Sequence, residues 1–295
     1  GLPYDGPPTV RRVEVEVEPG RTLSALVWGE GDPELVFLHG GAQNAHTWDT
    51  VALALDRPLV AIDLPGHGHS DGGKAGSLGV RENADDVATA IRALAPDARA
   101  VVGMSLGGAT TIALAGAHPD VVRSVVLVDV TPGVNQTKAA AIAAFVNGPE
   151  SFDSFDDLLQ RTIEFNPTRT VSSLRRGILH NAVQRDDGSW VWRYMRFRMP
   201  TGDAVAESPS ADTDSGAAAQ HPDFAWLWDV VGNLSVPLML VRGMTAQSVV
   251  DDDDEAEVLR RKPDARVEHV EGAGHSIQGD KPVELAALIA DFVSG

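Results

Sequence analysis

The chain has 295 residues, of which 43% are hydrophobic, which is enough for one large or two small domains with a buried core. Its net charge of −18 disfavours nucleic acid and anionic membrane surfaces as partners, and the lack of cysteine excludes disulfides, thiolate catalysis and cysteine–zinc sites. No apolar run approaches the roughly 20 residues that span a bilayer, and no signal peptide is visible, so we predict a cytoplasmic protein. A small molecule is the expected partner, and the sequence carries no signal for an oligomeric state.

The first part of the chain predicts strands. RRVEVEVEPG (11–20) alternates valine with glutamate, which is typical of a half-exposed strand, and RTLSALVWGEG (21–31) is predicted to pair with it as a hairpin. ELVFLHGG (34–41) is instead continuously apolar, which is typical of a strand buried on both faces. Further strands are predicted at residues 58–71, 98–105, 123–132, 236–243 and 265–275.

Helical patterns separate these strands. Residues 81–96 and 282–293 place apolar side chains at helical spacing, and residues 106–119 are rich in small side chains that allow close approach to a sheet. Strands that alternate with helices indicate an α/β fold with a mostly parallel sheet flanked by helices.

Residues 134–230 break this alternation. They contain no convincing buried strand, and we predict helices and loops there, with residues 201–220 as a loop. Because the strand pattern resumes at residue 236, an inserted helical cap fits better than a separate domain. The predicted division is therefore a core of residues 1–133 and 231–295 and a cap of residues 134–230. Tryptophans at positions 190, 192, 226 and 228 are expected in the cap core or in pocket walls.

The stretch GMSLGG (103–108) contains the motif G-x-S-x-G between a predicted strand and a predicted helix. This context is what the motif requires, because its glycines allow a sharp turn that exposes the serine hydroxyl beside a free backbone N–H. Ser105 is therefore the candidate nucleophile. A serine hydroxyl is a weak nucleophile alone, so a base is needed.

Together with LVFLHGG, AIDLPGHGHSD, VVLVDVTP and VEGAGHS, in that order, this motif resembles the α/β-hydrolase superfamily over nearly the whole chain. The resemblance implies an α/β-hydrolase fold with a helical cap inserted after the sixth strand, which matches residues 134–230. It also implies that His275, in the loop after the last strand, is the catalytic base. Serine at position 105 argues against the dehalogenases and epoxide hydrolases of this superfamily, which use an aspartate.

An oxyanion hole needs two backbone donors. The N–H of Leu106, directly after the serine, is one candidate. Gly41, after His39 and Gly40, is the second, with Ala42 as the alternative.

The third member of the expected catalytic triad is an acid that orients the histidine, and at this position the sequence departs from the family pattern. Relatives usually carry it in a G-x-x-D arrangement after the penultimate strand, whereas this chain has Gly243-Met244-Thr245-Ala246 there. We predict Asp129, at the end of the strand after the nucleophile, as some members of the superfamily have it. Asp251 is the alternative, although the run 251–255 also suits the start of a helix. A site without an acid is the third possibility.

Metal sites are not expected. His67 and His69 lack accompanying carboxylates at ligand spacing, and the acidic run 251–255 lacks the spaced ligands of a calcium loop. No cofactor is predicted. The hypothesis is a serine hydrolase that cleaves a small carboxylic ester or lactone through an acyl-enzyme. A carbon–carbon bond hydrolase or a perhydrolase with the same triad, and a non-catalytic ligand-binding protein on this fold, are the alternatives.

Overall fold

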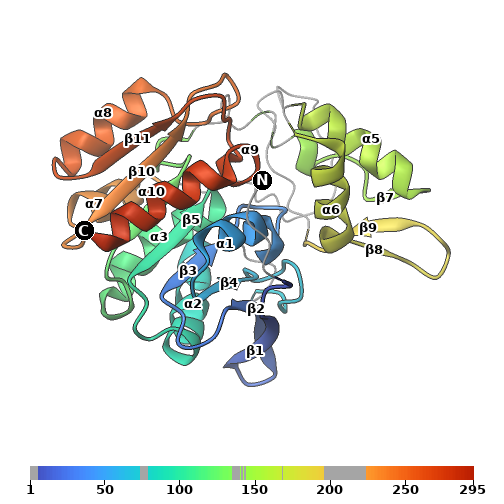
Figure 1. The fold of residues 1–295 in the computed structure, drawn as a ribbon, viewed down its shortest axis with the longest axis horizontal. Helices are drawn as coiled ribbons and strands as arrows, with labels where there is room; N and C mark the ends of the chain where they lie inside the picture. The colour runs from blue at the N-terminus through green and yellow to red at the C-terminus, as the bar shows by residue number, and fades with distance from the viewer. Residues whose placement is uncertain are drawn as a thin grey trace, which may run out of the picture.

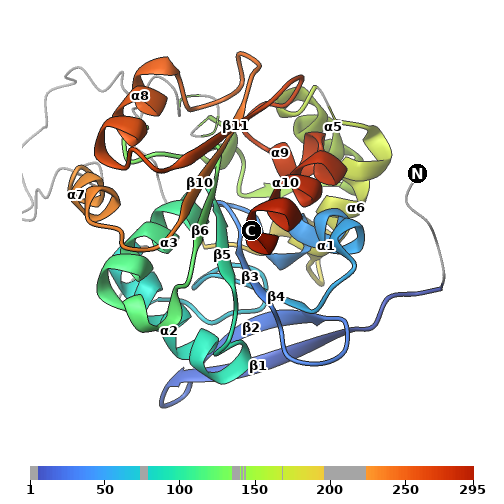
Figure 2. The same ribbon diagram turned by 60° about the vertical axis from the view of Figure 1, so that its left-hand side comes forward.

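In the computed structural model, which describes residues 6–73, 79–134, 140, 142, 144–167, 169–195 and 224–295, the predicted strands join into one eight-stranded sheet (Figure 2). The strand order is β1-β2-β4-β3-β5-β6-β10-β11. β1 and β2 form the predicted hairpin, β2 pairs antiparallel with β4, and all other neighbours are parallel. The strands are β1 (Val10–Glu18), β2 (Arg21–Trp28), β3 (Leu35–Leu38), β4 (Leu59–Ile62), β5 (Ala100–Met104), β6 (Val125–Val128), β10 (Leu238–Gly243) and β11 (Arg266–Val270).

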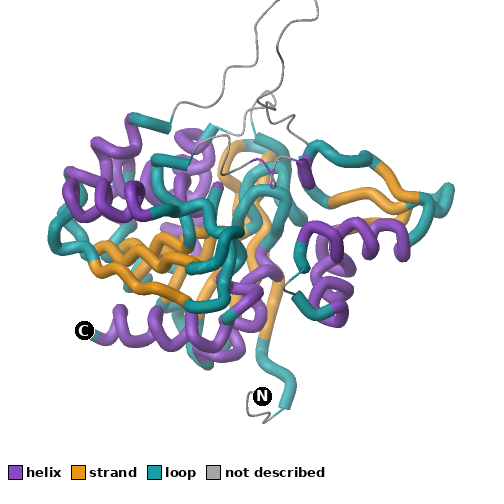
Figure 3. Tube along the Cα trace, turned by 90° about the horizontal axis from the view of Figure 1, so that it is seen from above, coloured by secondary structure: helices purple, strands orange, loops and turns teal. Residues whose placement is uncertain are grey.

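Helices cover both faces of the sheet (Figures 2 and 3). Successive side chains of a strand point to opposite faces, so Val36 and Leu38 pack into one hydrophobic cluster while Leu35 and Phe37 pack into the other. The first cluster includes α2 (Val80–Leu94), α3 (Leu106–Ala117), α7 (Trp226–Gly232) and α8 (Asp252–Arg261). The second includes α1 (Asp49–Leu55), α9 (Ile277–Asp280) and α10 (Pro282–Ser294). The short 3₁₀ helices are η1 (Ala45–Trp48) and η3 (Pro119–Val121). This is the predicted fold class.

The described part of the inserted region is a separate layer beside the sheet (Figure 1). It contains the helices α5 (Phe155–Phe165) and α6 (Val171–Asn181) and an antiparallel sheet of β7 (Ser151–Phe152), β9 (Trp190–Trp192) and β8 (Ala182–Gln184). We expected helices and loops there, and the small sheet is a difference from that expectation. Strands of two or three residues are too short to show a period of two in the sequence.

The C-terminal limit of the cap was predicted at residue 230, which lies inside α7. Leu227 and Val231 of this helix are fully buried in the same cluster as β3 and α3. α7 therefore packs with the sheet and its helices. The loop predicted at 201–220 lies outside the described residues.

No helix among the described residues is long and apolar enough to span a membrane.

Gly107 shows how tightly α3 packs on the sheet. A Cβ atom at this position would lie 2.3 Å from the carbonyl oxygen of Leu38, which is backbone and cannot move aside. Gly107→Ala should therefore lower the free energy of unfolding by about 3 kcal/mol or more. Gly177→Ala is the matched control, because its Cβ meets nothing within 4 Å and the residue lies inside α6, so we expect a gain of about 0.4–1 kcal/mol. Urea unfolding measures both; a loss below 1 kcal/mol at Gly107 would contradict the packing described.

Candidate active site

Ser105 and Asp129 follow the ends of two neighbouring strands and lie side by side at the edge of the sheet. β5 and β6 are parallel and pair Met104 with Val128. Ser105 directly follows β5, and Asp129 directly follows β6. Both have positive φ angles, 51° and 47°. Because the carboxyl ends of parallel strands share one edge of the sheet, both side chains lie at that edge.

The turn at Ser105 depends on the two glycines that flank it. A Cβ on Gly103 would lie 2.4 Å from the carbonyl oxygen of Gly107, so the strand and the helix approach too closely for larger residues. Ser105 has φ 51° and ψ −118°, a sparsely populated conformation for a residue with a side chain. Its side chain is partly exposed, and Leu106 begins α3 directly after it, with its N–H unbonded among the described residues.

Asp129 is completely buried and its carboxylate accepts four hydrogen bonds. Oδ1 accepts the Gly243 N–H at 2.9 Å and the Ser248 hydroxyl at 2.6 Å. Oδ2 accepts the Val249 N–H at 3.0 Å and Nδ1–H of His275 at 2.9 Å. The loop after β10, which lacks the expected aspartate, therefore supplies donors to the aspartate of the neighbouring strand. Ser248 and Val249 were not predicted from the sequence as partners of Asp129, because only an acid was expected in this loop.

His275 uses Nδ1 for Asp129, so its Nε2 is the nitrogen left to act on a substrate or a nucleophile. No hydrogen bond joins Ser105 to His275 in the described part of the chain, and in free enzymes this contact is often long and tightens with substrate. The alternative acid, Asp251, caps α8: its side chain accepts the Asp254 N–H at 3.0 Å. The structure thus brings His275 to Asp129, and places the Asp251 carboxylate on a helix terminus.

The loop of residues 39–44 lies beside the serine. A Cβ on Gly40 would be 3.3 Å from Cβ of Ser105. His39 is fully buried, its Nε2 accepts the Leu64 N–H at 2.9 Å, and its Nδ1 donates to the Gly40 carbonyl oxygen at 2.7 Å. In a trans peptide the N–H points away from the carbonyl, so the Gly41 N–H is directed away from His39. It has no acceptor among the described residues.

The neighbouring Ala42 N–H is already used. It donates to Nε2 of His67 at 3.2 Å, and the Nδ1 of His67 donates to the Pro65 carbonyl oxygen at 3.0 Å. Both ring nitrogens of His67 therefore have partners within the protein. Of the two candidate donors, Gly41 is the one with a free N–H.

The buried histidines predict how stability depends on pH. Burial, and secondarily His39, lowers the pKa of His67 to about 3, and burial lowers the pKa of His39. Unfolding restores a pKa near 6.5, so below pH 6.5 the unfolded chain binds more protons and the free energy of unfolding falls as pH falls toward 3. His67→Gln should reduce the slope between pH 6 and 5 by about 1.2 kcal/mol per pH unit relative to wild type. Urea unfolding at pH 7, 6 and 5 tests this, and equal slopes would contradict a buried neutral His67.

A cavity of about 180 Å³ opens between the 39–44 loop and the cap. Its lining is largely polar and includes Gln43, Arg169 and Gln278. Of the tryptophans at positions 190, 192, 226 and 228, only Trp192 lines this cavity. The other three have packing contacts: Trp190 packs on Phe155, and Trp226 and Trp228 lie under Arg81 and Arg261.

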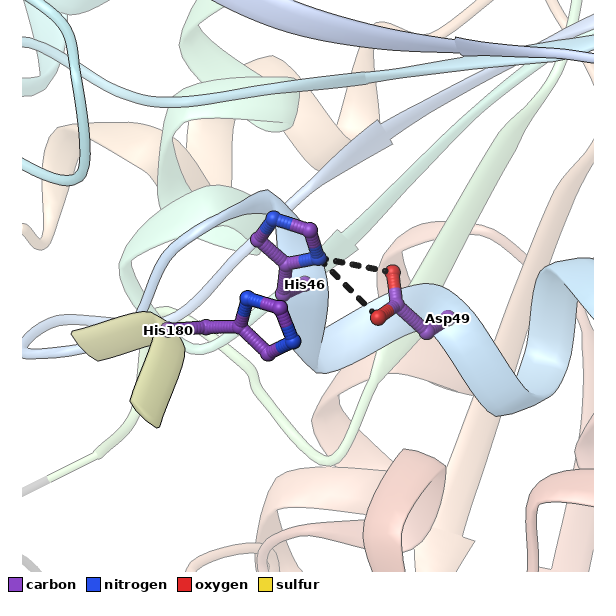
Figure 4. Close-up of side chains that lie close together, drawn as sticks. All are labelled: His46, Asp49 and His180. Carbon is purple, nitrogen blue, oxygen red and sulfur yellow. Dashed lines mark hydrogen bonds and ion pairs between the residues drawn. The ribbon is translucent and has the colours of Figure 1, made fainter. Parts of the chain in front are cut away.

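His46, Asp49 and His180 place ligand-type atoms within 4.8 Å of one another where the cap meets the core (Figure 4). The two imidazole rings are stacked at 3.7 Å with an angle of 18°, so their in-plane lone pairs cannot converge on one ion. Nδ1 of His46 is bonded to Asp49, while Arg12 approaches its Nε2 at 3.1 Å and Arg176 is paired with Asp49. The arrangement suits an ion-pair network, and we assign no metal to it.

Comparison with known proteins identifies relatives over most of the chain. A family model described as the alpha/beta hydrolase fold matches residues 33–282. Esterase Rv0045c from Mycobacterium tuberculosis is 44% identical over 283 residues, which cover 94% of this chain and 88% of that protein. A crystal structure of that esterase matches with a TM-score of 0.82 and 43% identity, covering 99% of this chain and 93% of the other. The 2-(acetamidomethylene)succinate hydrolase of Mesorhizobium japonicum is 29% identical over 289 residues, covering 96% and 94%.

The chain belongs to the alpha/beta hydrolase fold family, as its sheet order and serine turn also indicate. It is a hydrolase of that family, similar in sequence and structure to a mycobacterial esterase over nearly its whole length. The family and the fold class predicted from the sequence are confirmed.

Proposed function

We propose that this chain hydrolyses a small carboxylic ester or lactone through an acyl-enzyme on Ser105, with His275 as the base and Asp129 as the acid. The observation that carries the proposal is the 2.9 Å hydrogen bond from Nδ1 of His275 to the buried carboxylate of Asp129, at the sheet edge where Ser105 turns. The similarity to a protein named as an esterase supports the ester as the bond cleaved.

In this mechanism, Nε2 of His275 removes the proton of Ser105 as Oγ attacks the carbonyl carbon. The N–H groups of Gly41 and Leu106 stabilise the negative oxygen that forms. The imidazolium, stabilised by Asp129, then protonates the departing alcohol. Water, deprotonated by the same nitrogen, attacks the acyl-enzyme and releases the acid and the free serine.

The place of the substrate, its chemical kind and the location of the protein are part of the same proposal. The core and cap division predicted from the sequence would place the substrate between the 39–44 loop and the cap, beside the polar cavity. A small-molecule substrate and a cytoplasmic location complete the proposal. Neither a cofactor nor a metal takes part in any step.

The test is covalent labelling of the intact protein. A fluorophosphonate should add one phosphonyl group per chain, and peptide mapping should place it on Ser105, because only a serine activated by a base reacts readily. Urea-unfolded protein is the control and should remain unlabelled. Turnover of 4-nitrophenyl butyrate should disappear in proportion to labelling. An unlabelled wild type that does not turn over the ester would overturn the proposal in favour of a non-catalytic binding protein.

A further inference from the structure

The 39–44 loop is held from the cap as well as from the sheet. The side chain of Asn181, the last residue of α6, donates from Nδ2 to the Ala42 carbonyl oxygen at 2.8 Å. Asn44 donates from Nδ2 to Oδ1 of Asn181 and to the His180 carbonyl oxygen, both at 3.0 Å. One cap residue is therefore bonded to two residues of the loop.

The direction of these bonds is fixed by a neighbouring backbone group. Oδ1 of Asn44 accepts the His46 N–H at 3.0 Å, which leaves the amide nitrogen of Asn44 as a donor toward Asn181. Asn181 must then accept with its oxygen, so its own amide nitrogen faces the Ala42 carbonyl. The side-chain amides of Asn44 and Asn181 therefore each have one orientation that satisfies all of these hydrogen bonds.

Ala42 needs such support because its φ is 61°, in the left-handed region that a residue with a side chain adopts only at a cost. Two hydrogen bonds hold it on opposite sides. The peptide before it donates to His67, and the peptide after it accepts from Asn181. The Gly41 N–H belongs to the Gly40–Gly41 peptide, which directly precedes the peptide bonded to His67. Loss of either bond would let Ala42 relax toward negative φ, turn the Gly41–Ala42 peptide and shift the Gly40–Gly41 peptide joined to it.

We propose that Asn181 is a positioning residue for the oxyanion hole: it holds the Ala42 carbonyl from the cap and thereby keeps the Gly41 N–H aligned with the acyl oxygen at Ser105. The inference rests on the proposed function of Gly41. It makes the oxyanion hole a joint product of the sheet and the cap, because His39 and His67 hold one side of the loop and Asn181 holds the other.

The end of α6 is itself anchored to the core, which gives Asn181 a fixed place. Arg176 forms an ion pair with the buried Asp49, and the ring of His180 stacks on that of His46 at 3.7 Å (Figure 4). Both contacts join α6 to the segment that directly follows the 39–44 loop. The end of α6 and the 39–44 loop are therefore both held to this segment.

The test compares Asn181→Ala, Asn181→Asp and Gln184→Ala with wild type on 4-nitrophenyl butyrate. Asn181→Ala should lower kcat about 10- to 100-fold while KM changes less than about twofold, because a misplaced oxyanion donor weakens the transition state rather than substrate binding. Asn181→Asp retains an acceptor for Asn44 but cannot donate to Ala42, so its loss should be at least as large. Gln184→Ala removes an exposed cap amide whose nitrogen donates to the Gly188 carbonyl oxygen, and should match wild type.

A second readout separates positioning from general damage. The inhibition constant of an aryl trifluoromethyl ketone, which binds serine as an oxyanion, should rise by the same factor by which kcat/KM falls. The urea midpoints of the Asn181 variants should stay close to that of Gln184→Ala. Wild-type kcat in Asn181→Ala, or a rate loss with an unchanged inhibition constant, would overturn the inference. An inactive wild type would instead refute the proposed function.

Discussion

Ser105→Ala should lower kcat/KM for 4-nitrophenyl butyrate by about 10⁶-fold, because the triad acts as a unit and loses covalent catalysis when its nucleophile is removed. Fluorophosphonate labelling should vanish with it. Stopped-flow and long-time assays on purified variants measure the rates. Ser235→Ala, at an exposed serine just before the start of β10 and thus at the opposite end of that strand from Gly243, is the control and should keep the wild-type rate. A Ser105→Ala variant that retains more than a hundredth of the activity would assign the nucleophile to another residue.

The strained backbone at Ser105 supplies an independent check. Its φ of 51° with ψ of −118° suits glycine better than any residue with a side chain. Ser105→Gly should therefore be as inactive as Ser105→Ala but more stable than it by about 1–3 kcal/mol in urea unfolding. Equal stability of the two variants would show that the turn is not strained as described.

Asp129→Asn should lower kcat about 10⁴-fold with little change in KM. The neutral amide no longer stabilises the imidazolium of His275, and its NH₂ group faces donors on whichever side it lies, since each oxygen of Asp129 accepts two hydrogen bonds. The buried site should also lose stability, so kcat is measured on protein shown to be folded by circular dichroism.

Asp251→Asn provides the matched control. Asparagine caps helices about as well as aspartate, so α8 should be unaffected and kcat should remain within about twofold of wild type. The reverse pattern, a slow Asp251→Asn and a normal Asp129→Asn, would transfer the role of the acid to Asp251. Normal rates in both would leave His275 without an acidic partner and contradict the proposed triad.

The central strands of the sheet could be predicted because they are buried on both faces. A continuous apolar run such as LVFL at Leu35–Leu38, which is short and followed by glycines, is typical of a buried strand. The glycines around Ser105 mark the turn that follows β5. The cap was less readable. The strands β7, β8 and β9 have only two or three residues, and the burial of α7 against the sheet depends on a helix, α3, that is distant in the sequence.

The acid could be ranked from the sequence but its surroundings could not. Asp129 ends a strand, which any reader of the chain can see, yet its four donors come from residues 243, 248, 249 and 275, more than 110 positions away. Asp251 remained the alternative acid until the structure placed its carboxylate on the N-terminus of α8. Hydrogen bonds between distant loops leave no periodic trace in a sequence.

The sequence by itself therefore determined the fold class, the strand and turn that carry Ser105, and the loop that carries His275, because local propensity and short motifs encode turns and buried strands. Only the tertiary structure decided that Asp129 meets His275, that the Ala42 N–H is taken by His67, and that Asn181 of the cap holds the Ala42 carbonyl. These contacts depend on which strands become neighbours and on how the cap packs. The strand order and the position of the cap depend on how apolar side chains from distant segments pack together, and no single segment of the sequence determines them.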